Sequence, residues 1–170
     1  DAVGVETAGF QRIEAQSLYQ QYIRGSSWAR DLPGTLRGRP PVTVAKGIYQ
    51  GADGQVHTLL ATNEFYGAPG KVLEQGVRGG LRQFAAEQGW VFRGGTWTGQ
   101  TDASALHAEE VIVRYVESIA GNLPENTRVV VGIANDICTG CQPLGIVRFG
   151  AIIRELANGV RIILLGTGLE

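Results

Sequence analysis

At 170 residues, with 44% hydrophobic and 18% charged side chains, the chain has the size and composition of one globular domain with a sizeable core. The net charge of −1 excludes a global attraction to nucleic acid, so a nucleic-acid substrate would need a local basic face. No apolar run is long enough to cross a bilayer, which excludes a membrane partner, and two cysteines three positions apart exclude a disulfide-rich scaffold. The absence of methionine indicates a segment of a longer protein, and the terminal Leu169-Glu170 could be a cloning scar.

Residues 6–24 are predicted to form the first helix, since their apolar side chains recur at helical spacing. The side chains expected on its buried face are those of Ile13, Leu18, Tyr22 and Ile23. Turn-forming residues follow, so we interpret residues 1–40 as an N-terminal helix and linker that precede the main domain at 41–168. Arginines cluster at the linker, where they could form a solvated surface or contact phosphates. They are Arg24, Arg30, Arg37 and Arg39.

A β-hairpin is predicted at residues 42–61, where two strands rich in β-branched residues flank an Asp-Gly turn. Residues 63–103 are interpreted as a helical insertion in the domain. Within it we expect a helix at 71–88, weakened by two consecutive glycines. Residues 90–98 suggest a second small hairpin or a structured loop.

The last part of the chain alternates between helical and strand patterns. In chain order we expect a helix at 105–120, a strand at 128–134, a helix at 144–157 and a strand at 160–165. Asp102 or Ser104 is the expected N-cap of the first of these helices, and Gly121 is its expected stop. Strands that alternate with helices around buried apolar runs predict a layered α/β domain.

Metal-ligating residues occur at two places in this part of the chain. His107-Ala108-Glu109 opens the predicted helix at 105–120, and Cys138-Thr139-Gly140-Cys141 follows the strand at 128–134. One imidazole and two thiolates can hold a zinc ion and leave a fourth position for water. The remaining carboxylate, Glu109, can then move protons. If each group lies at a helix N-terminus, the helix field also favours thiolate over thiol.

Two other interpretations stay open for these residues. A C-x-x-C pair after a strand is typical of a thiol-disulfide oxidoreductase, but this leaves His107 and Glu109 without a role. His57 could instead join His107 and both cysteines in a closed structural zinc site, although it shows no ligand spacing.

The chain resembles the zinc-dependent nucleobase deaminase superfamily, whose pattern is H-x-E followed by P-C-x-x-C. Ile137 stands where that pattern has proline, which bears on the branch of the superfamily and not on the metal. The resemblance extends from the hairpin at 42–61 to the strand at 160–165. It implies a three-layer, cytidine-deaminase-like α/β fold with a mixed central sheet and helices on both faces.

The resemblance also implies roles for individual residues. His107, Cys138 and Cys141 would bind Zn²⁺, and Glu109 would carry protons in the hydrolytic loss of ammonia from cytosine or adenine. Some superfamily members contact nucleoside hydroxyls with an asparagine comparable to Asn63. A flipped base needs aromatic faces and edge hydrogen bonds. The aromatic residues available in loops are Trp97, which is the first choice, Phe65, Tyr66 and Trp28. Arg93 could meet a phosphate.

A second, less specific resemblance is to the C-terminal deaminase domains of bacterial polymorphic toxins, some of which act on DNA. It implies a secreted or delivered effector that deaminates cytosine in nucleic acid, with DNA favoured, inside a target cell. A cognate immunity protein would be its partner. Adenine, RNA and free nucleotides stay open as substrates.

Overall fold

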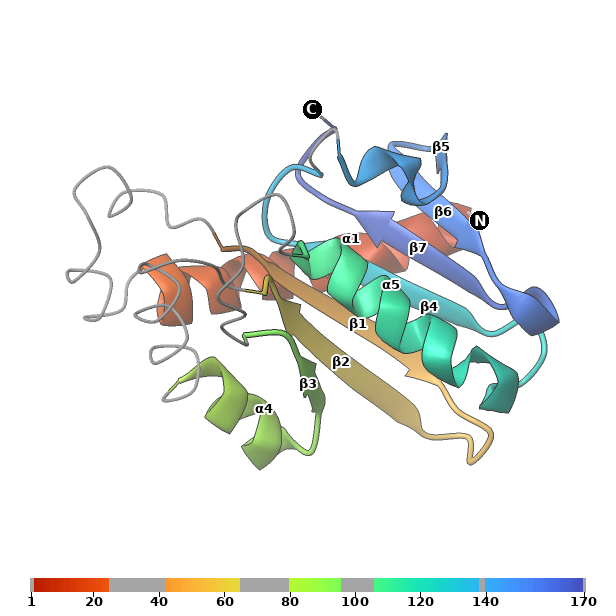
Figure 1. The fold of residues 1–170 in the computed structure, drawn as a ribbon, viewed down its shortest axis with the longest axis horizontal. Coiled ribbons are helices and arrows are strands. Elements are labelled where there is room, and N and C mark those ends of the chain that lie inside the picture. The colour runs from red at the N-terminus through yellow and green to blue at the C-terminus, as the bar shows by residue number, and fades with distance from the viewer. Residues whose placement is uncertain (1, 25–41, 65–79, 96–105, 138–139, 170) are drawn as a thin grey trace.

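A seven-stranded sheet lies between helices on both of its faces in a computed structural model of the protein (Figure 1). The structure describes residues 2–24, 42–64, 80–95, 106–137 and 140–169. Helix α1 (Ala2–Leu18) covers one face and continues into a π-helical segment, η1 (Tyr19–Arg24), while α5 (Ala108–Ile119) covers the other face. The predicted three-layer α/β arrangement with a mixed sheet is confirmed.

The order of the strands across the sheet is β3-β2-β1-β4-β7-β6-β5. Their bounds are β1 (Val44–Gln50), β2 (Val56–Thr62), β3 (Val91–Arg93), β4 (Arg128–Ile133), β5 (Ile146–Arg148), β6 (Ala151–Glu155) and β7 (Arg161–Leu165). The pairs β2–β3 and β4–β7 are parallel, and the other neighbours are antiparallel. The carboxyl ends of β2, β4 and β7 therefore lie at one edge of the sheet, which we call the carboxyl edge. The amino ends of β1 and β6 lie there too.

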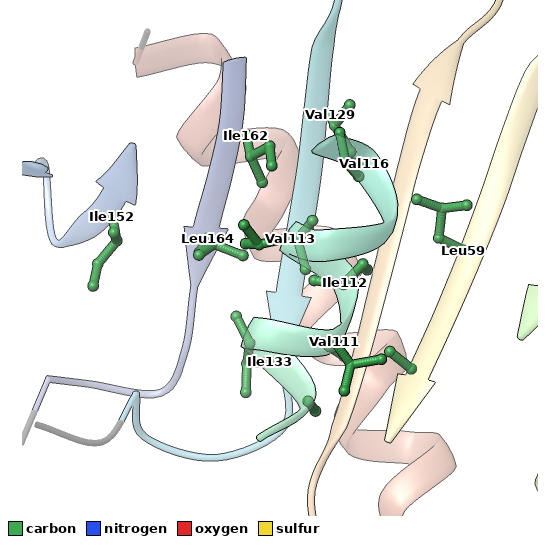
Figure 2. Packing of buried hydrophobic residues seen from close by; sticks show 14 of the residues in the cluster. Leu59, Val111, Ile112, Val113, Val116, Val129, Ile133, Ile152, Ile162 and Leu164 are labelled. Carbon is green, nitrogen blue, oxygen red and sulfur yellow. The ribbon is translucent and has the colours of Figure 1, made fainter. Parts of the chain in front are cut away.

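Helix α5, which lies within the predicted helix at 105–120, packs on the sheet through an apolar stripe. Val111, Ile112 and Val116 are buried beneath it, and Figure 2 shows them over the side chains of β2, β4 and β7. Strand β4 contributes alternate residues to this layer, with Val129 and Ile133 pointing towards the helix. Burial of this stripe fixes the rotation of α5, and with it the direction in which its first turn presents its side chains.

Helix α1 approaches the opposite face with small residues. Ala8 and Ala15 are fully buried, whereas Ile13 is 56% exposed, so the prediction that Ile13 faces the core is wrong. The close approach depends on Gly132 of β4, because a Cβ at that position would overlap the backbone of Gln11 and Arg12. Small side chains on both partners thus determine the helix–sheet distance, which a pattern of large apolar residues does not capture.

A buried lysine fastens α1 to the sheet. Lys46 of β1 is 4% exposed, and its Nζ donates to Oε1 of Gln11 and pairs with Oε2 of Glu14, both at 2.6 Å. The same ammonium lies 5.1 Å from the ring centroid of Trp90. A buried ammonium is stable only when it is paired and hydrogen-bonded, and α1 supplies both partners.

The predicted helix at 144–157 is wrong, because this segment forms the β5–β6 hairpin after a 3-10 turn, η5 (Gln142–Leu144). Its apolar residues have spacings that fit a helix or a short hairpin equally well. Isoleucine and valine favour strands, and β6 gains a pairing partner in β7. The tip of the hairpin is Phe149-Gly150, with both residues at positive φ.

The described end of the predicted helix at 71–88 is helical. Helix α4 (Leu81–Gln88) forms this part, and residues 71–79 lie outside the described residues. It ends at Gly89, whose φ of +74° is the left-handed value typical of a helix C-terminus. β3 then pairs with β2, and residues 96–98, which would supply the second strand of the hairpin expected at 90–98, lie outside the described residues. Among the described helices none has the length and apolarity needed to span a membrane.

Candidate metal centre

Helix α5 begins directly at the predicted ligand. His107 is the N-cap, with extended backbone angles (φ −78°, ψ 160°), and Ala108 is the first helical residue. The expected N-caps, Asp102 and Ser104, lie outside the described residues and do not cap this helix. An N-cap side chain points back over the helix end, which presents the imidazole at the carboxyl edge of the sheet.

The cysteine segment reaches the same place from β4. After that strand ends, Ile137 is completely buried and its backbone N–H donates to the carbonyl of Gly168 at 3.0 Å. A hydrophobic residue in the position of the superfamily's proline thus anchors the segment through the core. Cys141 follows and is itself fully buried.

The two segments meet at side-chain atoms. Sγ of Cys141 lies 3.3 Å from Nδ1 of His107, across 34 positions of sequence. Together with Glu109, these residues bring one candidate ligand atom each to within 4.8 Å of one another. The group could hold a metal ion. Cys138, the other predicted ligand, lies outside the described residues.

Glu109 occupies an unusual position for a carboxylate. It is 2% exposed, and its Oε1 has no hydrogen-bond partner among the residues that the structure describes. Burial raises the pKa of Glu109, and the neighbouring Cys141 thiol, the backbone and the charge of His107 oppose the rise. A buried, unpartnered carboxylate oxygen is costly unless a cation or a proton meets it. An imidazole, a thiol and this oxygen are a donor set that fits a divalent metal such as zinc.

Glu110 is a member of the site that the sequence interpretation missed. Its carboxylate accepts a hydrogen bond from the backbone N–H of His107 at 3.4 Å, as the N3 residue of a capping box does. The same oxygen lies 4.0 Å from Sγ of Cys141. An acidic residue three positions after a helix N-cap is the sequence signal for this contact.

The expected second helix start is absent. Cys141 caps η5, a single 3-10 turn of three residues that leads into β5. So short a turn carries little of the field of a long helix.

Asn63 and Arg93 are the predicted substrate contacts that fall in described residues. Oδ1 of Asn63 accepts from the backbone N–H of Thr43 at 3.0 Å, and the next residue, Glu64, donates its N–H to the carbonyl of Leu106. Asn63 thus lies beside the segment that leads into His107, with its oxygen committed to the start of β1. Arg93 is exposed and its guanidinium lies 4.6 Å from the ring centroid of Tyr115. Trp97, Phe65, Tyr66 and Trp28 lie outside the described residues.

His57 lies far from the metal group. It is near the start of β2, where its ring stacks on Tyr49 and its Nε2 contacts Asp53. The carboxyl edge is at the other end of that strand, five residues or roughly 17 Å from His57. The fold does not bring His57 to His107 and Cys141, so a closed structural site of these residues does not form.

Comparison of the chain with known protein families, with curated proteins and with solved structures found no match. The functional argument therefore rests on the geometry of this site and on the resemblance in its motifs.

Proposed function

We propose that the chain is a zinc-dependent deaminase that removes ammonia hydrolytically from cytosine in nucleic acid, with DNA as the favoured substrate. The observation that carries the proposal is the convergence of His107 and Cys141, 3.3 Å apart, beside the buried and unpartnered oxygen of Glu109. A ligand pair next to a proton-carrying carboxylate is the arrangement that such a hydrolysis needs.

The residues divide the work as follows. His107, Cys141 and, by its sequence spacing, Cys138 hold the metal. Zinc, when bound, supplies a Lewis acid that makes a water molecule nucleophilic at neutral pH. Glu109 would accept one proton from the attacking water and pass it to the ring nitrogen of the base, and would later move a second proton, from the hydroxyl group added to the ring, to the leaving amine. Burial raises the pKa of Glu109 above its ordinary value, which favours uptake of a proton by this carboxylate.

The choice of cytosine and of DNA comes from the resemblance of the motifs. A panel of substrates tests it: single- and double-stranded DNA and RNA that contain cytosine or adenine, and the free nucleosides. Ammonia release is measured for the wild type, for Glu109→Ala and for Glu125→Gln, a matched change of an exposed glutamate. We expect release from cytosine substrates by the wild type and Glu125→Gln only, with zinc content equal in all three proteins. Activity retained in Glu109→Ala would refute the proposal, and release from adenine, RNA or nucleosides would replace the substrate and keep the chemistry.

A thiol-disulfide oxidoreductase is the rival from another class. Cys141, the second thiol of the pair, is completely buried, and the first, Cys138, lies outside the described residues. The oxidoreductase leaves the burial of Glu109 beside Cys141 unexplained. Reduction of a model disulfide at equal rates by the wild type and by Glu109→Ala, in protein free of zinc, would favour this rival.

The biological setting follows from the second resemblance. As a delivered effector the enzyme would act in the cytoplasm of a target cell. The cell that produces it would need a cognate immunity protein that covers the carboxyl edge of the sheet. Co-expression with the neighbouring genes of the producer, followed by pull-down, tests this setting. Failure of every neighbour to bind would contradict it.

A further inference from the structure

The tip of the β5–β6 hairpin carries a phenylalanine in a conformation that phenylalanine rarely adopts. Arg148 pairs with Ala151, so the turn consists of two residues, Phe149 (φ +54°) and Gly150 (φ +76°). Two-residue turns with positive φ at both positions strongly favour Asn-Gly and similar pairs. A bulky side chain in the left-handed region is a strained exception, and such exceptions concentrate at functional sites.

Neither the turn nor the core explains the choice of residue. The side chain of Phe149 is 67% exposed, and it belongs to none of the apolar clusters in the described part of the chain. Ile146 and Val147 beside it are 67% and 50% exposed. The hairpin therefore holds an aromatic ring in water, at a position where asparagine would be more stable.

The hairpin tip lies at the carboxyl edge of the sheet. Ile152 of β6 pairs with Leu164 of β7, and Gly132 at the end of β4 pairs with Leu165. The turn thus projects from the same edge as the metal group. Two to three strand spacings separate it from β4, which is roughly 10–14 Å. This distance equals a few stacked nucleotide steps at about 3.4 Å each.

The surroundings of the ring are cationic. Arg148 is exposed and is the only charged residue of the sequence between Ile137 and Ile153. A cavity of about 450 Å³ along the hairpin is lined by Arg148, Arg154 and Arg161, with Glu155 as its acidic member. Two of these guanidinium groups have carboxylate partners, Arg154 with Glu117 and Arg161 with Glu155. Arg148 leaves this surface positive next to the exposed ring.

We propose that the hairpin tip binds the polynucleotide substrate beside the target base, with the Phe149 ring stacked on or inserted between neighbouring bases and Arg148 on a phosphate. The inference rests on the proposed function and names a polynucleotide, not a free nucleoside, as its substrate. Apolar side chains that enter base steps unstack them, and a base must leave its stack before a deaminase can reach it. The strain falls on the projecting tip and not on the open edge of β5, which favours insertion over docking of a protein strand.

Phe149→Asn separates this role from folding, because asparagine suits the turn better than phenylalanine does. We expect the melting temperature of Phe149→Asn to equal or exceed that of the wild type. The dissociation constant for a fluorescein-labelled cytosine-containing oligonucleotide, measured by anisotropy, should rise roughly 5- to 100-fold, the effect of removing one aromatic stack. Phe149→Trp should bind within about twofold of the wild type, because it restores a stacking face.

Arg148→Gln tests the phosphate contact in the same assay. Its affinity should fall for every oligonucleotide, and the slope of log affinity against log salt should decrease by about one. An unchanged dissociation constant in Phe149→Asn, or a loss confined to binding of a protein partner, would overturn the inference. Binding and ammonia release are measured in separate assays, so the two proposals fail separately. A wild type that releases no ammonia while Phe149→Asn weakens binding refutes the deaminase and keeps the nucleic-acid contact.

Discussion

Replacing Glu109 by glutamine should abolish activity and yet stabilise the metal-free protein. The side chain is 2% exposed and its Oε1 has no partner among the described residues, so Cys141, the backbone and His107 compensate an ionised carboxylate there only in part. A buried polar group left unsatisfied costs on the order of 1–3 kcal/mol, and a charged one costs more. Glutamine keeps the shape and removes the charge. For a protein of this size about 1 kcal/mol corresponds to roughly 2–4 °C in melting temperature.

The effect has a definite dependence on pH. Burial makes the pKa of Glu109 higher in the folded protein than in the unfolded chain. The folded state therefore holds the proton more tightly, and its stability falls as the pH rises from the ordinary carboxyl range through the raised pKa. Glu109→Gln lacks this loss. The two proteins should unfold alike in acid, and the variant should gain stability towards neutral pH.

Thermal unfolding in the presence of a chelator, from about pH 4 to about pH 8, measures this difference directly. Glu125→Gln, which changes an exposed glutamate, serves as the control and should follow the wild type throughout. A Glu109→Gln protein that is less stable than the wild type at neutral pH would refute the reasoning. A gain of equal size at every pH would refute it too, because the charge would then not be its source.

Three further changes test the site and its support. Glu110→Gln should weaken zinc binding roughly 10- to 100-fold in competition with a chromophoric chelator, since residues that orient ligands have effects of this size, while Glu87→Gln should leave zinc affinity unchanged. Gly132→Ala should lower the free energy of unfolding in urea by about 1–3 kcal/mol, because α1 must move away from β4, whereas Gly121→Ala, which meets open space, should have little effect. His57→Ala should retain a full equivalent of zinc by atomic emission, and loss of the metal would show that our placement of His57 is wrong.

The sequence predicts those parts of the fold in which large apolar residues follow the pattern of a helix stripe or of a buried strand. The stripe of α5 and the buried strand at β4 are of this kind, because burial of Val111, Ile112 and Val129 leaves one orientation for each element. The convergence of His107 and Cys141 follows from the same elements, since a helix start and a strand end at one edge bring their side chains together.

The predictions are wrong where an interaction other than the burial of large apolar residues determines the structure. The segment at 144–157 has spacings that suit a helix, but pairing of β6 with β7 offers its β-branched residues a better partner. Ile13 is expected in the core because large apolar residues are usually buried. The close approach of α1 to Gly132 requires small residues on the helix instead. The role of Glu110 depends on a backbone contact, which a search for metal ligands does not consider.

The anchoring of Lys46 has a practical consequence for the shortest version of this protein that can fold. Gln11 and Glu14 bind its ammonium from the same helix whose Ala8 and Ala15 pack against the sheet. A version trimmed to start at the first strand would therefore lose the partners of the lysine and also open Val44, Leu60 and Val130 to water. Full burial of side chains of this kind contributes about 1.5–3 kcal/mol each, so the loss would be a large share of the stability of an ordinary domain. Engineers who wish to split or shorten the protein should therefore keep its first two dozen residues.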